Sequence, residues 1–273
     1  MGVADVTVPG PDRRHSAVPL PVRLLAGIAV TFLAAPVIAI VVRTPWSRLV
    51  DLLTQPEVLQ ALRVSVGVSI ASVVVAAVLG LPLAWVLARV EFPGKRLVRA
   101  LCVLPMVLPP VVGGVALFFA FGRRGVFGRV VEALTGVTLP FSSAGVVVAI
   151  TFVAMPFLIV TVEAGLRAID PAMERAAATL GASRWTVFRR VTLPLAAPSL
   201  LAGAAVCWAR ALGEFGATIT FAGALPGRTQ TMPVEIFLRL QTDTDAAVAL
   251  SLVLLIVSVA VLVGLRHRFL GPG

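Results

Sequence analysis

Two ionisable residues stand four positions apart inside one long apolar stretch of the chain. Arg210 and Glu214 lie within the run 196–221, and residues at i and i+4 share one face of a helix. A charge inside a membrane costs about 2.5–3.5 kcal/mol on insertion scales, so each side chain needs a partner or water. The pair predicts either a gate that handles a passing anion or a structural ion pair. Because Glu214 cancels most of the field of Arg210, we expect no tight anion site there.

Groups for other kinds of chemistry are scattered along the sequence. His15 and His267 lie near the two ends, and Cys102 and Cys207 lie inside apolar runs. Thiols in such runs are more often small packing residues than disulfides or metal ligands. The sequence has no nucleophile–base arrangement and no G-x-x-x-x-G-K-[ST] phosphate loop. We therefore predict no catalytic residue, no metal and no cofactor bound by this chain.

Proline and glycine gather in the apolar run 98–121. Proline removes a backbone donor and bends or breaks a helix, and neighbouring helices can satisfy the carbonyls that it frees. Pro109 and Pro110 therefore predict a bent or broken helix, which either lines a passage or only packs. Pro156, in the next run, is a weaker sign of the same kind, and Ser65 and Ser69 favour a close helix approach.

The composition shows which elements must position these residues. Of the 273 residues, 59% are apolar and 13% are charged, and the mean hydropathy is +1.01. Soluble domains carry about 45–50% apolar and about 25% charged residues, which excludes an ordinary soluble enzyme. The net charge of +10 is spread between apolar runs, as in membrane-protein loops, so we do not expect nucleic-acid binding.

Six apolar runs are each long enough to cross a hydrocarbon core of roughly 30 Å as a helix. They are residues 22–42, 64–88, 98–121, 144–165, 196–221 and 246–265. The sequence therefore predicts an all-α polytopic membrane protein with six transmembrane helices. We divide it into an N-terminal tail 1–21, a first helix 22–42, a main domain 58–265 and a tail 266–273. Residues 49–63 suggest a short amphipathic surface segment.

Basic residues set the expected orientation. Fourteen Lys and Arg flank the runs on the side that holds both termini, against eight on the other side. The positive-inside rule then places both termini in the cytoplasm. The first run follows three arginines, as the apolar core of a signal peptide would, but it exceeds the 7–15 apolar residues of a typical signal core. We favour a retained anchor.

The cytoplasmic loop 166–195 carries the clearest local signals. Asp170 followed by Pro171 is a good helix start, and residues 173–180 favour two helical turns. Gly181 suits a left-handed end to that helix. Ser183 is expected to cap a second helix, 184–191, before Pro194 and Pro198 break the chain. The alanines of the first helix indicate either helix propensity alone or a small face that docks on another protein.

This loop resembles the EAA loop of ABC importer permeases, a pattern of EAA, three residues, Gly, nine residues and then I-x-L-P. The residues in register are Ala176, Ala177, Gly181, Val191, Leu193 and Pro194. The first position of the pattern holds Arg175, and a glutamate stands one residue earlier, at Glu174. The resemblance implies a type I importer fold and a helix that couples to a separate ATPase. It assigns that coupling to Glu174, Arg175, Ala176, Ala177, Gly181, Ala182, Arg184 and Pro194.

Two further stretches indicate which branch of the ABC importer permeases the sequence resembles. Residues 104–110 read LPMVLPP before GRRG at 122–125, and residues 209–217 read ARALGEFGA before AGALPGRTQT at 222–231. Together they resemble molybdate permeases, with sulfate permeases next. The resemblance implies a homodimeric permease of the bacterial inner membrane, two ATPase subunits that bind ATP and Mg, and an extracytoplasmic molybdate-binding protein. It also points to Arg210, Glu214, Pro109 and Pro110 as pathway or gate residues.

Alternatives remain at this point. Sulfate or tungstate could replace molybdate as the substrate, since a binding protein would discriminate among tetrahedral oxyanions. A secondary anion transporter would have more ionisable residues at mid-membrane, and an intramembrane enzyme would have paired catalytic groups. In the outer loop, Arg228, Thr229 and Gln230 are candidates for contact with a binding protein, although an ordinary solvated loop is equally consistent.

Overall fold

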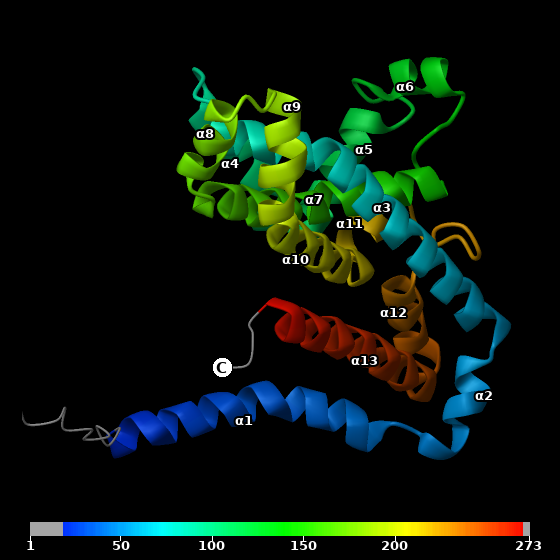
Figure 1. Ribbon diagram of the computed structural model, residues 1–273. Helices are drawn as coiled ribbons and strands as arrows, with labels where there is room; N and C mark the ends of the chain where they lie inside the picture. Colours follow the sequence, from blue (N-terminus) through cyan, green and yellow to red (C-terminus); the bar gives the residue numbers. More distant parts are fainter. Residues whose placement is uncertain (1–18, 270–273) are drawn as a thin grey trace, which may run out of the picture. The chain divides into compact units, whose positions relative to one another are not determined.

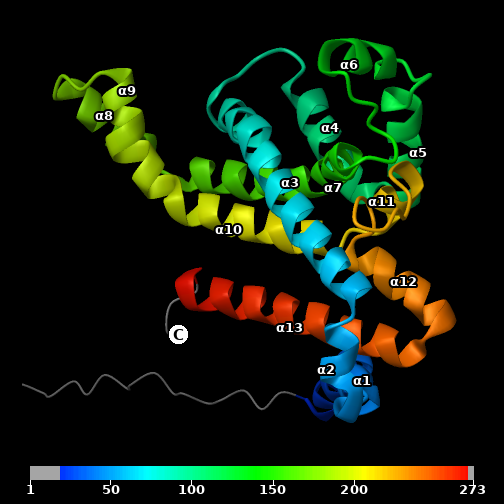
Figure 2. The ribbon, with the colours of Figure 1, turned by 90° about the vertical axis from the view of Figure 1, so that its right-hand side faces the viewer.

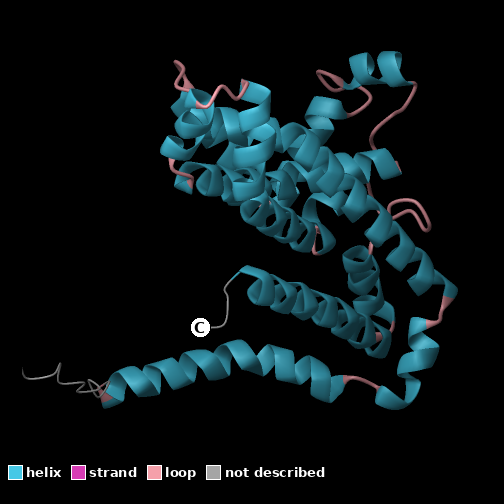
Figure 3. Cartoon of the chain, in the orientation of Figure 1, coloured by secondary structure: helices cyan, strands magenta, loops and turns pink. Residues whose placement is uncertain are grey.

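The computed structural model describes residues 19–269, and these residues form helices and no strands (Figures 1 and 3). The chain divides into two units, residues 1–43 and 44–273. The first unit contains one described helix, α1 (Leu20–Arg43), which covers the predicted first run and is long and apolar enough to span a membrane. Most of the predicted tail 1–21 lies outside the described residues.

The second unit begins with short helices that lead into a long one. The 3₁₀-helix η1 (Trp46–Arg48) and helix α2 (Leu49–Leu53) precede α3 (Pro56–Arg89). Helix α3 has 34 residues and starts well before the predicted residue 64, because Pro56 at the first position suits a helix start. The expected surface segment 49–63 is thus wrong as one element. Its second half belongs to α3, where Val58 and Ala61 are buried.

The predicted run 98–121 is two helices. Helices α4 (Lys95–Val107) and α5 (Pro110–Phe121) meet at an angle of 119°. Leu108 and Pro109 between them have extended backbone angles, since a residue that precedes proline is pushed away from the helical region. The break predicted from the prolines is confirmed, and one continuous helix over this run is wrong.

Helix α7 (Ser143–Ala168) lies at the centre of the second unit, after the short α6 (Gly128–Thr135). It continues through Pro156 and is the most buried of the candidate spans. Helix α3 packs along it at Ser72, whose hydroxyl donates to the carbonyl of Val147 at 3.2 Å. Ser65 and Ser69, predicted to favour a close helix approach, accept from the Met232 amide at 2.6 Å and from the Trp208 indole N–H at 3.1 Å, so other helices do lie close to α3 at both positions.

The last helices complete the unit. Helices α8 (Pro171–Thr179) and α9 (Arg184–Val187) project from it, followed by a π-helical turn η2 (Phe188–Thr192) and α10 (Leu193–Leu212). Then come α11 (Gly216–Phe221), α12 (Met232–Thr242) and α13 (Thr244–Phe269). Helices α7, α10 and α13 run roughly parallel, and α3 crosses them (Figure 2). Helix α13 extends into the predicted tail 266–273, whose end lies outside the described residues.

Five helices could each cross a membrane alone, and the bent α4–α5 pair gives a sixth candidate. This agrees with the six predicted spans. The fifth predicted span, 196–221, needs a correction, because α10 stops at Leu212 and α11 starts only at Gly216. Glycines at 213 and 216 disfavour a continuous helix.

Candidate coupling segment and pathway

Residues 170–194, here called the coupling segment, fold as their local signals predict. The Asp170 carboxylate accepts a hydrogen bond from the Ala172 amide at 2.8 Å, and Pro171 occupies the first turn of α8. Gly181 has φ +84°, a conformation that costs a residue with a Cβ about 1–2 kcal/mol. The Ser183 hydroxyl accepts from the Thr186 amide at 3.2 Å and caps α9. The segment is therefore a stiff turn with two capped ends.

The glutamate of this segment faces inward. The Glu174 carboxylate accepts from Arg89, at the end of α3, at 2.9 Å and from the Thr192 hydroxyl at 2.8 Å. Its neighbours Arg175 and Ala176 are exposed, while Ala177 is half-buried beside Glu174 on the helix. The shift of the glutamate by one position therefore attaches α8 to α3 and to η2. It leaves Arg175 free to face a partner.

The predicted break at Pro194 and Pro198 is wrong. The chain runs as one helical rod from Arg184 to Leu212. The π turn η2 accommodates the prolines by shifting the register of the backbone hydrogen bonds. The Leu193 amide donates to the carbonyl of Phe188, five residues back, and Pro194 sits in the first turn of α10, where no amide donor is needed. The coupling segment is thus continuous with the fifth span.

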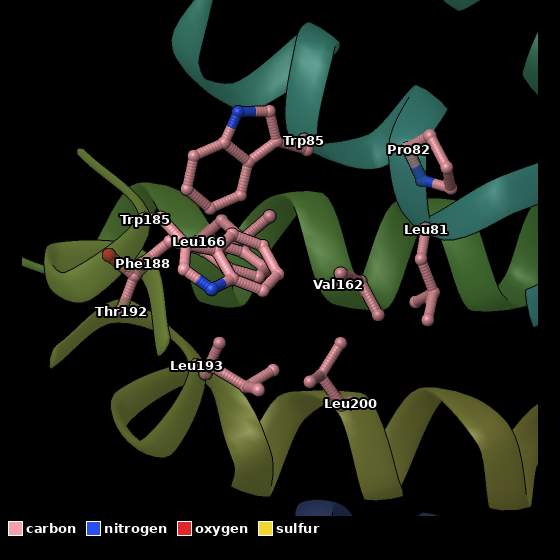
Figure 4. A pocket seen from close by; sticks show the side chains of 11 residues that line it. Leu81, Pro82, Trp85, Val162, Leu166, Trp185, Phe188, Thr192, Leu193 and Leu200 are labelled. Carbon is pink, nitrogen blue, oxygen red and sulfur yellow. The ribbon is translucent and has the colours of Figure 1, made fainter. Parts of the chain in front are cut away.

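Aromatic side chains support the base of this rod. Phe188 stacks on Trp185, with ring centroids 5.5 Å apart, and meets Trp85 of α3 edge-on at 5.2 Å. They stand at one end of an apolar cavity of about 470 Å³ between α3, α7 and the rod (Figure 4). Val162 and Leu200 line its other end. Trp185 and Phe188 therefore lie on one face of the rod.

The outer face of the coupling segment carries apolar side chains. Leu180 is 88% exposed, Trp185 67% and Met173 54%. Ala182 is half-buried, and Arg184 is exposed. Exposed apolar side chains on a short projecting helix are typical of a protein-interaction surface. The outer face of the coupling segment is therefore apolar and open to solvent.

The Arg210–Glu214 pair forms, although not on one helix. The guanidinium of Arg210 lies 2.6 Å from the Glu214 carboxylate, but α10 has ended by Gly213. The Glu214 side chain turns back, and its other oxygen accepts from the Ala217 amide at 2.8 Å. That side chain is 1% exposed and that of Arg210 is 28% exposed. Glu214 therefore also holds the start of α11, a role that the i, i+4 spacing does not reveal.

The breaks in the two interrupted runs lie against each other. A Cβ added to Gly216 would lie 2.7 Å from the Cβ of Pro110, and one added to Gly114 would overlap the Thr220 hydroxyl. Helices α5 and α11 are therefore in close contact. We call residues 108–110 and 213–215 the paired breaks. They bring Pro110 near Glu214, so the structure brings together candidates that the sequence gave no reason to group.

Buried ionic groups outside these sites were not singled out from the sequence. Glu163 of α7 binds Arg99 at 2.6 Å and Arg167 at 2.9 Å. Glu235 of α12 is 2% exposed and binds Arg239 at 2.8 Å. The signal for Glu163 was available, because it is a lone acid inside the predicted run 144–165, and such residues need partners.

Hydrogen bonds within the protein hold most of the outer loop 222–231 in place. Thr229 is fully buried and its hydroxyl accepts from the Leu225 amide at 2.8 Å, while Gln230 hydrogen-bonds Glu235. Arg228 is exposed. Of the three predicted contact residues, Thr229 thus serves the loop itself and Arg228 is available to a partner. The residues in the described range contain no group of three potential metal ligands.

The sequence matches the family model described as "Binding-protein-dependent transport system inner membrane component" over residues 78–273. The chain belongs to this family. Its apolar helices and the family description agree on a multi-pass protein of the inner membrane. The resemblance to ABC importer permeases is confirmed.

Curated relatives are named for molybdenum and sulfate transport. A molybdenum transport system permease protein of Mycobacterium tuberculosis is 48% identical over 227 residues, 82% of this chain and 86% of the relative. Its Escherichia coli K12 counterpart is 42% identical over 186 residues, 68% of this chain and 81% of the relative. A Salmonella typhimurium sulfate transport system permease protein is 38% identical over 195 residues, 71% of this chain and 70% of the relative.

A solved structure supports the fold of this family. The structure of a bacterial alginate ABC transporter, in complex with an alginate-bound periplasmic protein, aligns with a TM-score of 0.70 and 20% identity. The alignment covers 91% of this chain and 92% of that chain. The all-α permease fold predicted from the sequence is therefore confirmed. This binding-protein-dependent permease shares that architecture with the matched chain of the alginate transporter.

Proposed function

We propose that this chain is the transmembrane permease subunit of an ATP-driven molybdate importer. The identities of 42–48% to molybdenum permeases support the substrate. The observation that carries the mechanism is the exposed, doubly capped coupling segment at one end of a continuous helix. Sulfate or tungstate is the alternative substrate, supported by the 38% identity to a sulfate permease. A secondary anion transporter has less support, because it would not need a docking segment.

The proposed partners follow from this role. Two copies of the chain form the passage in the lipid bilayer, and two ATPase subunits bind ATP and Mg and receive the coupling segments. A binding protein outside the membrane delivers the anion. Both termini are cytoplasmic, on the side of the coupling segment. No cofactor, metal or nucleic acid binds this chain itself.

The rod from Arg184 to Leu212 provides the coupling. Its 29 residues span roughly 44 Å at 1.5 Å per residue, with the coupling segment at one end and Arg210 at the other. Closure of the ATPase subunits displaces α8, and Glu174 transmits that displacement to Arg89 of α3 and to the π turn. The rod carries the motion to the paired breaks, which open or close the passage.

The paired breaks suit a gate better than a binding site. Arg210 attracts an oxyanion, but Glu214 stands 2.6 Å from it and cancels most of that field. An anion thus passes without being held, and selectivity lies with the binding protein. Pro109 and Pro110 allow the backbone to change direction, and residues at such discontinuities can absorb hinge motion.

The test is uptake of labelled molybdate by proteoliposomes that contain this chain, its ATPase and its binding protein. We expect uptake that requires ATP and resists excess sulfate. The variant Leu180→Asp should abolish uptake and ATPase binding, because Leu180 is 88% exposed and its loss leaves the fold intact. Leu134→Asp on α6, at 81% exposure, is the matched control and should transport normally.

Other outcomes would change the proposal. Inhibition by sulfate together with sulfate uptake would keep the mechanism and replace the substrate. Uptake without ATP or without the ATPase would refute the proposal and support a secondary transporter. Equal uptake by the Leu180→Asp and Leu134→Asp variants would show that the exposed face of the coupling segment has no coupling role.

A further inference from the structure

A second polar site lies on the same side of the unit as the coupling segment, at the turn between α3 and α4. A cavity of about 340 Å³ opens there, lined by the turn itself, the first residues of α4 and the end of α7. Its charged lining residues are Glu91, Lys95, Arg96, Arg99 and Arg167. Four of these five are cations, so the cavity has a strong preference for an anion.

Buried Glu163 holds two of these cations in place. One oxygen of its carboxylate accepts from Arg99 Nε at 3.1 Å and from Arg99 Nη2 at 2.6 Å. Arg167 Nη2 lies 2.9 Å from the same oxygen as an ion pair. The Arg167 Nη2 also donates to the carbonyl of Leu87 at 3.2 Å. The other N–H groups of both guanidiniums have no partner among the described residues. They are thus positioned donors that a phosphate oxygen can use.

The remaining charges leave an excess of positive charge. Lys95 Nζ lies 2.6 Å from the Glu91 carboxylate, and the hydrogen bond and charge of Lys95 lower the pKa of Glu91. That carboxylate is 90% exposed, so water screens its field. Arg96 is exposed and has no ion pair within the described part of the chain. Four cations thus face two carboxylates, Glu91 and Glu163, which leaves a net charge of +2.

An apolar stripe starts beside this cavity. Leu97, Leu101 and Leu104 of α4 are 65%, 57% and 46% exposed, and their spacing of four and three residues puts them on one face. Val98 and Cys102, on a neighbouring face of the helix, pack against the core. The exposed stripe runs along α4 away from the basic cavity. Its geometry is that of a surface for acyl chains below a charged headgroup.

We propose that the cavity binds the phosphate of an anionic phospholipid from the adjacent leaflet, with the lipid chains on the leucine stripe. Charge and position both favour this occupant, since basic pockets between helices at the cytoplasmic surface suit anionic headgroups. A free anion would use only the cavity and would gain nothing from the stripe. The bound lipid fixes the α3–α4 turn near the Arg89 contact of the coupling segment.

Native mass spectrometry of the full chain in neutral detergent tests the proposal. We expect one dioleoyl phosphatidylglycerol per chain to be retained more tightly than dioleoyl phosphatidylcholine. The variant Arg96→Gln should weaken phosphatidylglycerol about fivefold, the factor that corresponds to roughly 1 kcal/mol per basic side chain near an anionic surface. Leu101→Asn should also weaken it. Arg190→Gln, an exposed arginine outside the cavity, is the matched control and should retain the lipid.

Four results would overturn the proposal. One is equal retention of the two lipids, and another is equal affinity of the Arg96→Gln and Arg190→Gln variants. The third is displacement of the lipid by inorganic phosphate or molybdate at comparable concentration, together with no effect of Leu101→Asn, which would indicate a free-anion site. A change of oligomeric state in Arg96→Gln would indicate instead that a second copy covers the cavity. Both Arg96 and Leu101 are exposed, so failure to fold does not confound the test.

Discussion

The coupling segment and the paired breaks lie at opposite ends of the same rod, yet different forces shape them. The coupling segment is set by its own sequence, through an Asp cap, a left-handed glycine and a Ser cap. The paired breaks begin at local prolines and glycines, but contacts between distant helices hold them against each other, where Pro110 meets Gly216 and Gly114 meets Thr220. One end therefore keeps its shape while its outer face stays exposed. The other end depends on buried neighbours.

Charge shows the same contrast. In the coupling segment, Arg175 and Arg184 are exposed and ready for a partner. In the paired breaks, Glu214 is nearly inaccessible and its oxygens serve Arg210 and the Ala217 amide. Surface charges are cheap to change, whereas an unpaired buried charge costs several kcal/mol. Substitutions at the two ends should therefore differ in what they damage, docking at one end and folding at the other.

The largest effect is expected at Glu214. The variant Glu214→Gln leaves Arg210 without its counter-charge in a site that is mostly closed to water, and should lower the free energy of unfolding by about 3 kcal/mol. The measurement is titration with sodium dodecyl sulfate in mixed micelles. Asp245→Asn, which breaks an exposed pair with Arg48, is the matched control and should cost less than about 1 kcal/mol.

A double variant sharpens this test. Replacing Arg210 and Glu214 together by Gln removes the charges in pairs, so it should cost less than Glu214→Gln alone. If Glu214→Gln costs no more than Asp245→Asn, the paired breaks are not held by the buried ion pair. Packing alone would then account for the difference in stability between the paired breaks and the coupling segment.

A smaller effect is expected from packing at the paired breaks. Gly114→Ala places a Cβ against the Thr220 hydroxyl and 2.9 Å from the carbonyl of Ala217, and such overpacking costs about 1–3 kcal/mol. Gly113→Ala meets only a carbon of the Phe152 ring, at 3.3 Å, and the ring can move. Both variants gain the same helix propensity, so the difference between their unfolding midpoints isolates the contact. Equal midpoints would mean that α5 and α11 separate easily.

The same contrast explains what the sequence could predict. The caps and the left-handed glycine act within a few residues, so Asp170, Gly181 and Ser183 were placed correctly. The break after Leu108 was also predictable, because two adjacent prolines forbid a regular helix. The number of spans followed from apolar length alone. All of these signals are local to the segment that they shape.

The errors lie where a distant contact or a rare geometry decides. Pro194 and Pro198 predicted a break in the chain, but the π turn shifts the register of the backbone hydrogen bonds and the helix continues. The run 196–221 was expected to be one helix from its apolar length, but Gly213 and Gly216 end α10 at Leu212 and start α11 at Gly216. The inward direction of Glu174 depends on Arg89, 85 residues away along the chain. Long-range partners of this kind cannot be deduced from one sequence.

The smallest effect on stability is expected at Gly181, where the effect on coupling should still be clear. A Cβ at Gly181 would meet nothing within 4 Å, so Gly181→Ala carries only the backbone strain of a left-handed residue, about 1–2 kcal/mol. Because the turn is exposed, it can relieve that strain by changing shape without unfolding the core. We expect a normal unfolding midpoint together with weaker ATPase binding. Gly181→Asn should be milder, since Asn tolerates this conformation.

A matched control exists at the end of α6. Gly136 has φ +68° and also has open space around it, so Gly136→Ala introduces the same strain far from the coupling segment along the chain. It should leave ATPase binding unchanged. A loss of global stability in Gly181→Ala, or equal ATPase binding in the two alanine variants, would contradict the view that this end of the rod is shaped locally and used for docking. Loss of ATPase binding in Gly181→Ala but not in Gly136→Ala would show that the ATPase recognises the shape of the capped turn, because neither substitution changes a contact with the core.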